Sequence, residues 1–168
     1  TATETTAIGI SINYSIVTNI DNEHLDYYKN YKNLEKSFIK FINRTPPIGK
    51  CIICLDDKNI KKIKAKIKTK NTLTYGYDKN SDYQIINSRF NSKNCKFDLI
   101  IKNFSGKRKL IRNIYLNLIG KYNILNSTAA ICVCINLGIK TNIIKKALNK
   151  FSGVQRRMTK IFEKNNNE

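Results

Sequence analysis

The first 77 residues alternate short apolar runs with segments whose apolar residues recur at helical spacing. The apolar runs cover residues 14–19, 50–57 and 71–77, and each has the length of a buried strand. Residues 33–44 and the lysine-rich stretch 56–67 have the spacing of amphipathic helices. Strands that alternate with helices favour a parallel sheet with crossover helices, because a tight turn cannot join parallel neighbours.

The pattern changes in the second half of the chain, where three strand-length runs follow one another with polar breaks such as "NSKN" and "FSGKRK". This predicts a small antiparallel sheet over residues 82–119, at the edge of the parallel one. Residues 124–137 are apolar almost all round, which predicts a buried helix that ends at Gly138. Residues 141–151 predict another helix, capped by Thr141. The predicted fold class is α/β, a mostly parallel sheet with flanking helices plus a small antiparallel sheet.

The chain is strongly basic, with 31 Lys and Arg against 12 Asp and Glu and a formal net charge of +19 in 168 residues. Such a charge suits a nucleic acid, a membrane surface or an anionic substrate. The lysines are spread along the chain, which favours a solvated surface over a nucleic-acid-binding face. Neither an RNA-binding signature nor a helix-turn-helix with clustered arginines is visible. We therefore do not expect nucleic acid as a partner, and a basic nucleic-acid-binding module stays the alternative interpretation.

The chain has five cysteines, and neither a secretory signal nor a run of about 18 apolar residues is visible. The odd number favours reduced thiols, so we expect a cytoplasmic protein without a membrane partner. Cys51 and Cys54 form a C-x-x-C within a predicted strand. Residues three apart on a strand point to opposite faces, which argues against a zinc site there.

The single histidine, His24, follows the first predicted strand and lies between Glu23 and Asp26. Two interpretations are open from the residues alone. His24 is either a loop histidine bonded to one of these carboxylates, or a metal ligand at a strand end, where open parallel sheets collect functional groups. Magnesium usually prefers oxygen ligands, so the residues by themselves favour the loop histidine.

The segments "TNIDNEHLDYY", "GKYNILNSTAAICVCINLGI" and "FSGVQRRM" resemble, in this order, motifs of the Mur ligase central domain. "TPPIGKCIICLDD" and "TLTYG" fit the same order, and the resemblance runs from about residue 13 to about residue 160. Among the family, the chain is most similar to the member that joins L-alanine to UDP-N-acetylmuramate in peptidoglycan precursor synthesis. The resemblance implies a ligase that uses ATP and Mg²⁺ and forms an acyl phosphate.

The resemblance also implies roles for four residues. His24 would be a catalytic group that coordinates magnesium near the terminal phosphate of ATP. Asn123 and Asn126 would contact the adenine end, since an amide can both donate to and accept from a purine edge. Arg157 would reach the nucleotide phosphates. The alternative for Asn123 is that it simply caps the helix that follows.

Two features of the family's pattern are missing from the chain. It contains no G-x-x-x-x-G-K-[ST] phosphate loop, and Glu4 does not align with the family's magnesium-binding glutamate. We therefore expect residues 1–12 to be an altered or remnant segment, residues 13–150 the ATP-binding central domain, and residues 151–168 a hinge into a C-terminal domain. The chain would then be a fragment, truncated at its N-terminal side, without its neighbouring N- and C-terminal domains and inactive alone. A non-catalytic remnant is the other interpretation.

Overall fold

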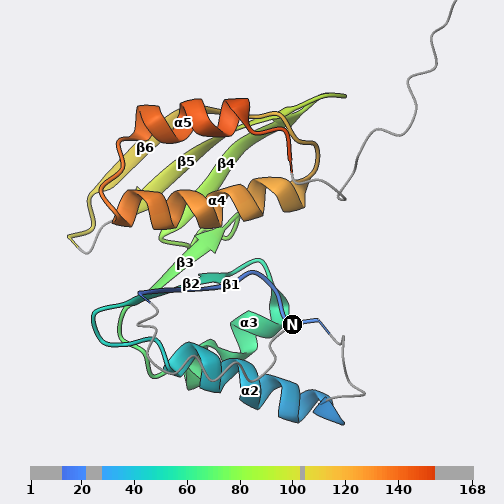
Figure 1. Ribbon diagram of the computed structural model, residues 1–168, viewed down its shortest axis with the longest axis vertical. Helices are drawn as coiled ribbons and strands as arrows, with labels where there is room; N and C mark the ends of the chain where they lie inside the picture. Colours follow the sequence, from blue (N-terminus) through green and yellow to red (C-terminus); the bar gives the residue numbers. More distant parts are fainter. Residues whose placement is uncertain (1–12, 22–27, 103–104, 154–168) are drawn as a thin grey trace, which may run out of the picture.

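The computed structural model describes residues 13–21, 28–102 and 105–153, which form a six-stranded sheet covered by helices (Figure 1). The strands lie in sequence order across the sheet, from β1 to β6. The strands are β1 (Tyr14–Val17), β2 (Lys50–Cys54), β3 (Thr72–Gly76), β4 (Tyr83–Phe90), β5 (Cys95–Lys102) and β6 (Arg108–Leu116). The helices are α2 (Tyr31–Asn43), α3 (Lys58–Ile63), the 3-10 turn η1 (Lys64–Lys66), α4 (Lys121–Asn136) and α5 (Thr141–Lys150).

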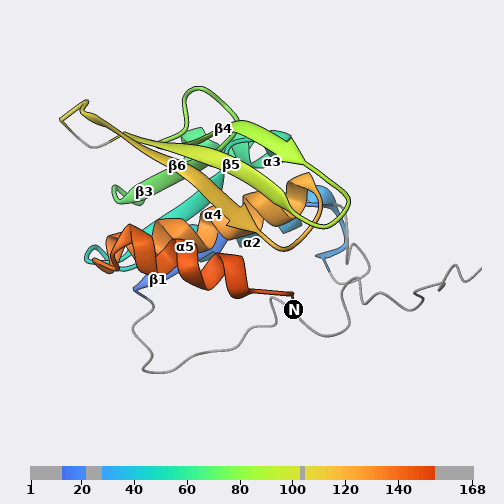
Figure 2. The same cartoon turned by 90° about the horizontal axis from the view of Figure 1, so that it is seen from above.

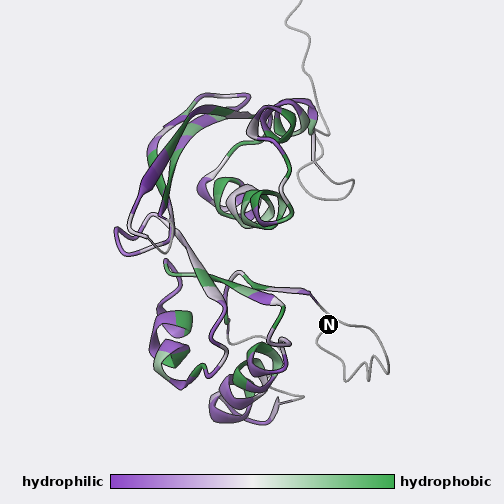
Figure 3. Cartoon of the chain, turned by 90° about the vertical axis from the view of Figure 1, so that its left-hand side faces the viewer, coloured by the Kyte–Doolittle hydropathy of each residue, from purple (hydrophilic) through white to green (hydrophobic). Residues whose placement is uncertain are grey.

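The first three strands form the expected parallel sheet. β1 pairs with β2 and β2 with β3, both in parallel, and α2 and α3 are the crossover helices. Figures 1 and 3 show α2 and α3 on one face of these strands and α4 on the other. Because both faces are covered, β2 is apolar along almost its whole length, and Cys51 and Cys54 are both buried free thiols.

β4 joins the parallel and antiparallel halves into one continuous sheet. It runs parallel to β3 over two residue pairs only, Tyr75 with Tyr83 and Gly76 with Gln84, and antiparallel to β5. The connection of residues 77–82 is too short to return along the whole of β3. β4 therefore begins beside the end of β3 and extends past it. The predicted antiparallel part is confirmed, but it continues the main sheet instead of forming a separate one.

The two C-terminal helices lie on the same side of β4–β6, as Figure 2 shows. The buried helix is confirmed as α4, and Gly138 follows it with φ 78°, the left-handed conformation expected of a helix-terminating glycine. The prediction of a Thr141 cap is wrong. Lys140 is the extended residue before α5, so Thr141 is already helical, and no side-chain cap is found among the described residues.

None of the helices in the described part of the chain is both long and apolar enough to cross a membrane. α2 and α3 instead turn apolar residues towards the sheet, and much of their outer surface is hydrophilic (Figure 3). α2 buries Leu34 and Ile42 in this way, and α3 buries Ile60 and Ile63.

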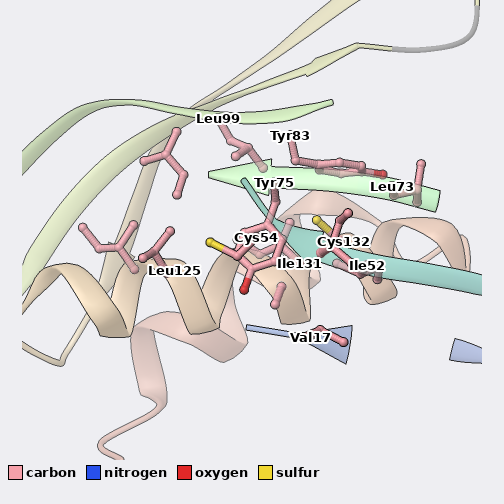
Figure 4. Close-up of a cluster of buried hydrophobic side chains, with 14 of the residues drawn as sticks. Val17, Ile52, Cys54, Leu73, Tyr75, Tyr83, Leu99, Leu125, Ile131 and Cys132 are labelled. Atoms are coloured by element: carbon pink, nitrogen blue, oxygen red, sulfur yellow. The ribbon is translucent and has the colours of Figure 1, made fainter. Parts of the chain in front are cut away.

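Two buried tyrosines lie between the sheet and α4, and they differ in their hydrogen bonding. Figure 4 shows Tyr75 of β3 beside Cys54 and Ile131. The Tyr75 hydroxyl makes no hydrogen bond of normal geometry in the described part of the chain, and burial, followed by the nearby Cys54 thiol, raises its pKa. The Tyr83 hydroxyl accepts a hydrogen bond from Asn136 Nδ2 at 2.9 Å, and burial raises its pKa to about 12.

Removing these two hydroxyls is expected to have opposite effects on stability. Tyr75→Phe removes an unpaired buried polar group, so the free energy of unfolding should rise by up to about 1 kcal/mol. Tyr83→Phe removes a hydroxyl that accepts a hydrogen bond, so the free energy of unfolding should fall by about 1 kcal/mol. Urea denaturation of the two variants, followed by circular dichroism, measures both changes. A loss of stability in Tyr75→Phe as large as that in Tyr83→Phe would show that the Tyr75 hydroxyl has a partner.

Candidate functional site

The carboxyl ends of the parallel strands and the start of α4 meet at one edge of the molecule, which we call the carboxyl rim. It comprises residues 18–21, 55–57 and 77–78, after β1, β2 and β3, together with Gly120 and residues 121–126 at the start of α4. Parallel strands end at the same edge, where open α/β sheets bind ligands. The start of α4 lies at this edge, as the contact between Lys121 and Tyr77 shows: Lys121 Nζ is 4.9 Å from the centre of the Tyr77 ring.

The segment after β1 is held against α3. Asn59 Nδ2 donates to the Ile20 carbonyl at 2.7 Å, and the Ile20 side chain is fully buried. The exposed polar residues around it bond to one another: Thr18 Oγ1 donates to Asn19 Oδ1 at 2.8 Å, and Asn19 Nδ2 donates to Asp21. The chain therefore leaves β1 in a fixed direction along the rim, up to Asp21.

Asp56 ties the ends of β2 and β3 together. Its carboxylate accepts from the Tyr77 N–H at 2.9 Å and from the Asp78 N–H at 3.0 Å. Gly76 lets the two approach, since a Cβ built there would lie 2.7 Å from Asp56 Oδ1, and its φ is 143°. The turn after β3 is therefore fixed by backbone hydrogen bonds to one side chain.

An ion pair lies at the outer side of this turn. Lys61 Nζ and the Asp78 carboxylate are 2.5 Å apart. The hydrogen bond between them lowers the pKa of Asp78 and raises the pKa of Lys61. The Lys61 side chain is exposed and the Asp78 side chain is partly buried, so solvent screens the pair and it orders the surface more than it stabilises the fold.

The first two turns of α4 present polar side chains to solvent at the rim. Asn126 is exposed, and Tyr122 is 83% exposed. Asn123 is half-buried, and its Nδ2 donates to the Ile119 carbonyl at 2.8 Å. The cap position belongs to Gly120, so the alternative that Asn123 caps the helix is wrong.

This end of α4 is suited to an anionic or nucleotide ligand. The first turn holds no acidic residue and carries the Lys121 ammonium, while the N–H groups of a helix start attract negative charge. Within the described ranges, no three His, Cys, Asp or Glu side chains gather in a group that could hold a metal ion. The described part of the rim therefore has the charge and the helix start that suit an anionic ligand.

Two of the four residues predicted for the site, Asn123 and Asn126, are placed together on the first two turns of α4. His24 and Arg157 lie outside the described residues, so their approach to this rim stays a prediction. Sequence reasoning missed Lys121 and Tyr77. Tyr77 follows a predicted strand, which is a weak signal for a rim residue, but nothing in the sequence links it to a lysine 44 positions later.

Comparison with known proteins decides the family. The model of the Mur ligase middle domain matches residues 2–134. The chain belongs to the Mur ligase family. It is 53% identical, over 150 residues, to the UDP-N-acetylmuramate–L-alanine ligase of Pelagibacter ubique (strain HTCC1062). The match covers 89% of this chain and 32% of that protein, so the chain spans about a third of the relative's length.

Solved structures confirm the α/β fold. A UDP-N-acetylmuramoyl-L-alanyl-D-glutamate–2,6-diaminopimelate ligase superposes with a TM-score of 0.72 at 20% identity, covering 93% of this chain and 31% of that one. The MurF ligase from Thermotoga maritima in complex with ADP gives a TM-score of 0.64 at 17% identity, covering 84% and 31%. At these identities the likeness shows the shared architecture, a mostly parallel sheet with an antiparallel extension.

Proposed function

We propose that this Mur ligase chain is the nucleotide-binding part of an ATP-dependent ligase that joins L-alanine to UDP-N-acetylmuramate. The observation that carries the proposal is the start of α4, where Asn123 and Asn126 lie beside Lys121 at the carboxyl rim. The L-alanine ligase with 53% identity supports the choice of substrates. The ADP complex of the Thermotoga maritima ligase supports a nucleotide as the ligand.

Each rim residue has a role in this proposal. Asn126 offers an exposed amide to the purine edge, and Asn123, fixed by its bond to Ile119, holds the turn from which Asn126 projects. Lys121 places a positive charge beside the nucleotide, steadied by the Tyr77 ring. Arg157 would contact the phosphates as a charged, multiply donating group.

His24 is proposed as the protein ligand of a magnesium ion at the phosphates. Magnesium commonly takes one or two protein ligands and completes its shell with water and phosphate oxygens, so the number of ligands fits a single side chain. Because magnesium usually prefers oxygen, the choice of a histidine nitrogen is supported by the resemblance to the Mur ligase motif and not by the residue type. When bound, the ion offsets negative charge that builds on the phosphoryl oxygens. Asp21, three positions before His24 in the sequence, is exposed at the rim and accepts a hydrogen bond from Asn19 Nδ2.

The ligase reaction has two steps. The substrate carboxylate attacks the terminal phosphate of ATP, which gives an acyl phosphate and ADP. The amine of L-alanine then attacks the acyl carbon, and phosphate leaves from the tetrahedral intermediate. In both steps the residues of this chain would bind and orient the nucleotide. The protein would work in the cytoplasm on a peptidoglycan precursor. Residues 13–150 would be the central domain, and residues 151–168 the hinge.

Nuclear magnetic resonance of the ¹⁵N-labelled chain can test whether the α4 turn recognises the adenine end. Magnesium–ATP should shift the signals of Asn123 and Asn126, while magnesium–tripolyphosphate, which has charge but no base, should not. Asn126→Ala should weaken this base-dependent binding roughly fivefold, the value of one hydrogen bond of about 1 kcal/mol.

Asn149→Ala is the matched control, because it removes an exposed amide from α5, away from the rim. It should leave the affinity for ATP unchanged. Identical shifts with ATP and tripolyphosphate would contradict recognition of the base at α4.

A further inference from the structure

The positive charge of this chain is unevenly balanced along the sequence. Ten of the 12 acidic residues lie in the first 98 positions, and between Asp98 and Glu163 the sequence has nine Lys and four Arg but no acidic residue. Lysines occur throughout, so it is the missing carboxylates that make the second half basic. β6 and α5 both belong to this half.

The structure gathers part of this charge around a groove between β6 and α5. The groove has a volume of about 540 Å³ and is open to solvent. Lys109 and Arg112 line it from β6, and Lys145 and Lys146 line it from α5. Leu110 and Ile111 also line it and add apolar surface. Side chains from two elements far apart in sequence thus place four cations around one hollow.

These cations are poorly neutralised by the protein itself. The two ion pairs seen in the described ranges, Lys61–Asp78 and Lys66–Glu35, involve α3 and η1, at the other end of the molecule (Figure 1). Lys145 Nζ donates to the Arg112 carbonyl at 2.9 Å, which holds its charge within the groove. An anion bound in the groove would interact favourably with these cations.

One carboxylate, Asp98 on β5, is near enough to Arg112 for the two charges to interact electrostatically. Its oxygens already accept hydrogen bonds from Asn87 Nδ2 at 2.9 Å and from the Asn113 N–H at 2.8 Å. Within the described residues Arg112 forms no ion pair with it at salt-bridge distance. The guanidinium therefore stays available to an outside anion.

Contrary to the expectation from the spread of lysines along the sequence, we propose that the groove between β6 and α5 binds the phosphate backbone of single-stranded nucleic acid without regard to sequence. The shape favours a strand over a membrane surface, because a phosphodiester chain in the groove meets cations on both walls. A flat bilayer would contact only the outer edges of this groove. No aromatic side chain lines the groove, so contacts run to the phosphates and sequence is not read.

The salt dependence of binding gives a quantitative test. Four phosphate contacts to a single strand predict a slope of about −2.8 in a plot of log affinity against log salt. The affinity for a fluorescein-labelled oligothymidine of about eight nucleotides should then fall roughly 50-fold between 50 and 200 mM salt. The double variant Arg112→Gln/Lys146→Gln should have a slope of about −1.4 and lose roughly sevenfold over the same range.

Lys36→Gln/Lys62→Gln is the charge-matched control, since it removes two exposed lysines from α2 and α3. It should keep the slope of the unmodified chain. An equal change in both double variants would mean that overall charge, not the groove, binds the oligonucleotide, and would overturn the proposal. So would binding to phosphatidylserine vesicles but not to the oligonucleotide. The base-dependent ATP shifts at α4 should be the same in the groove variant, so this test and that of the ligase function fail independently.

Discussion

The purified chain, supplied with ATP, magnesium, UDP-N-acetylmuramate and L-alanine, is expected to release no phosphate above the blank. Phosphoryl transfer depends mainly on positioning and on charge stabilisation at the phosphates. The sequence contains no G-x-x-x-x-G-K-[ST] loop, whose backbone amides and lysine would hold them. Losing even one preorganised charge-stabilising donor costs about 100- to 1000-fold in rate. The amides of α4 cannot compensate, because they would bind the end of ATP remote from the chemistry.

The role of His24 is best measured where turnover is expected. In a longer chain that joins this sequence to a phosphate loop and an amino-acid-binding domain, His24→Ala should lower kcat about 100- to 1000-fold. Lys36→Gln, on the outer face of α2, is the control and should leave kcat unchanged. Two results would contradict the proposal: full activity of His24→Ala in the longer chain, or turnover by the present chain that disappears in His24→Ala.

Gly76→Ala is expected to cause the largest loss of stability of any substitution discussed above, about 2–6 kcal/mol. Its φ of 143° is one that side-chain-bearing residues rarely adopt, which costs on the order of 1–3 kcal/mol. The new Cβ would also lie 2.7 Å from Asp56 Oδ1, and such overpacking typically adds about 1–3 kcal/mol. Because small domains are stable by only about 5–15 kcal/mol, this change should lower the urea midpoint strongly.

Gly106→Ala separates the two causes. Its φ of 74° also lies in the left-handed region, but a Cβ there has nothing within 4 Å. It should cost about 1–2 kcal/mol, from the backbone conformation alone. A loss in Gly76→Ala no larger than that in Gly106→Ala would show that the Asp56 carboxylate moves away without cost.

The sequence by itself determined the elements and their order. Apolar runs such as residues 50–54 are strands because both faces of a parallel sheet are buried, and the near-uniform apolar character of α4 follows from the same burial. The resemblance to the Mur ligase motifs could also be read from the sequence, because each of the motifs around His24, Asn123 and Arg157 is a short continuous segment. Their order along the chain could be read without knowing any distance.

Only the tertiary structure decided what lies beside what. The helix cap at Gly120 instead of Asn123 depends on where the chain leaves β6, which residue type does not specify. The continuity of the sheet rests on two residue pairs between β3 and β4, set by the length of one turn. The contact of Lys121 with Tyr77 and the groove between β6 and α5 join residues far apart in sequence. Such contacts arise from packing, and packing leaves no local pattern in the sequence.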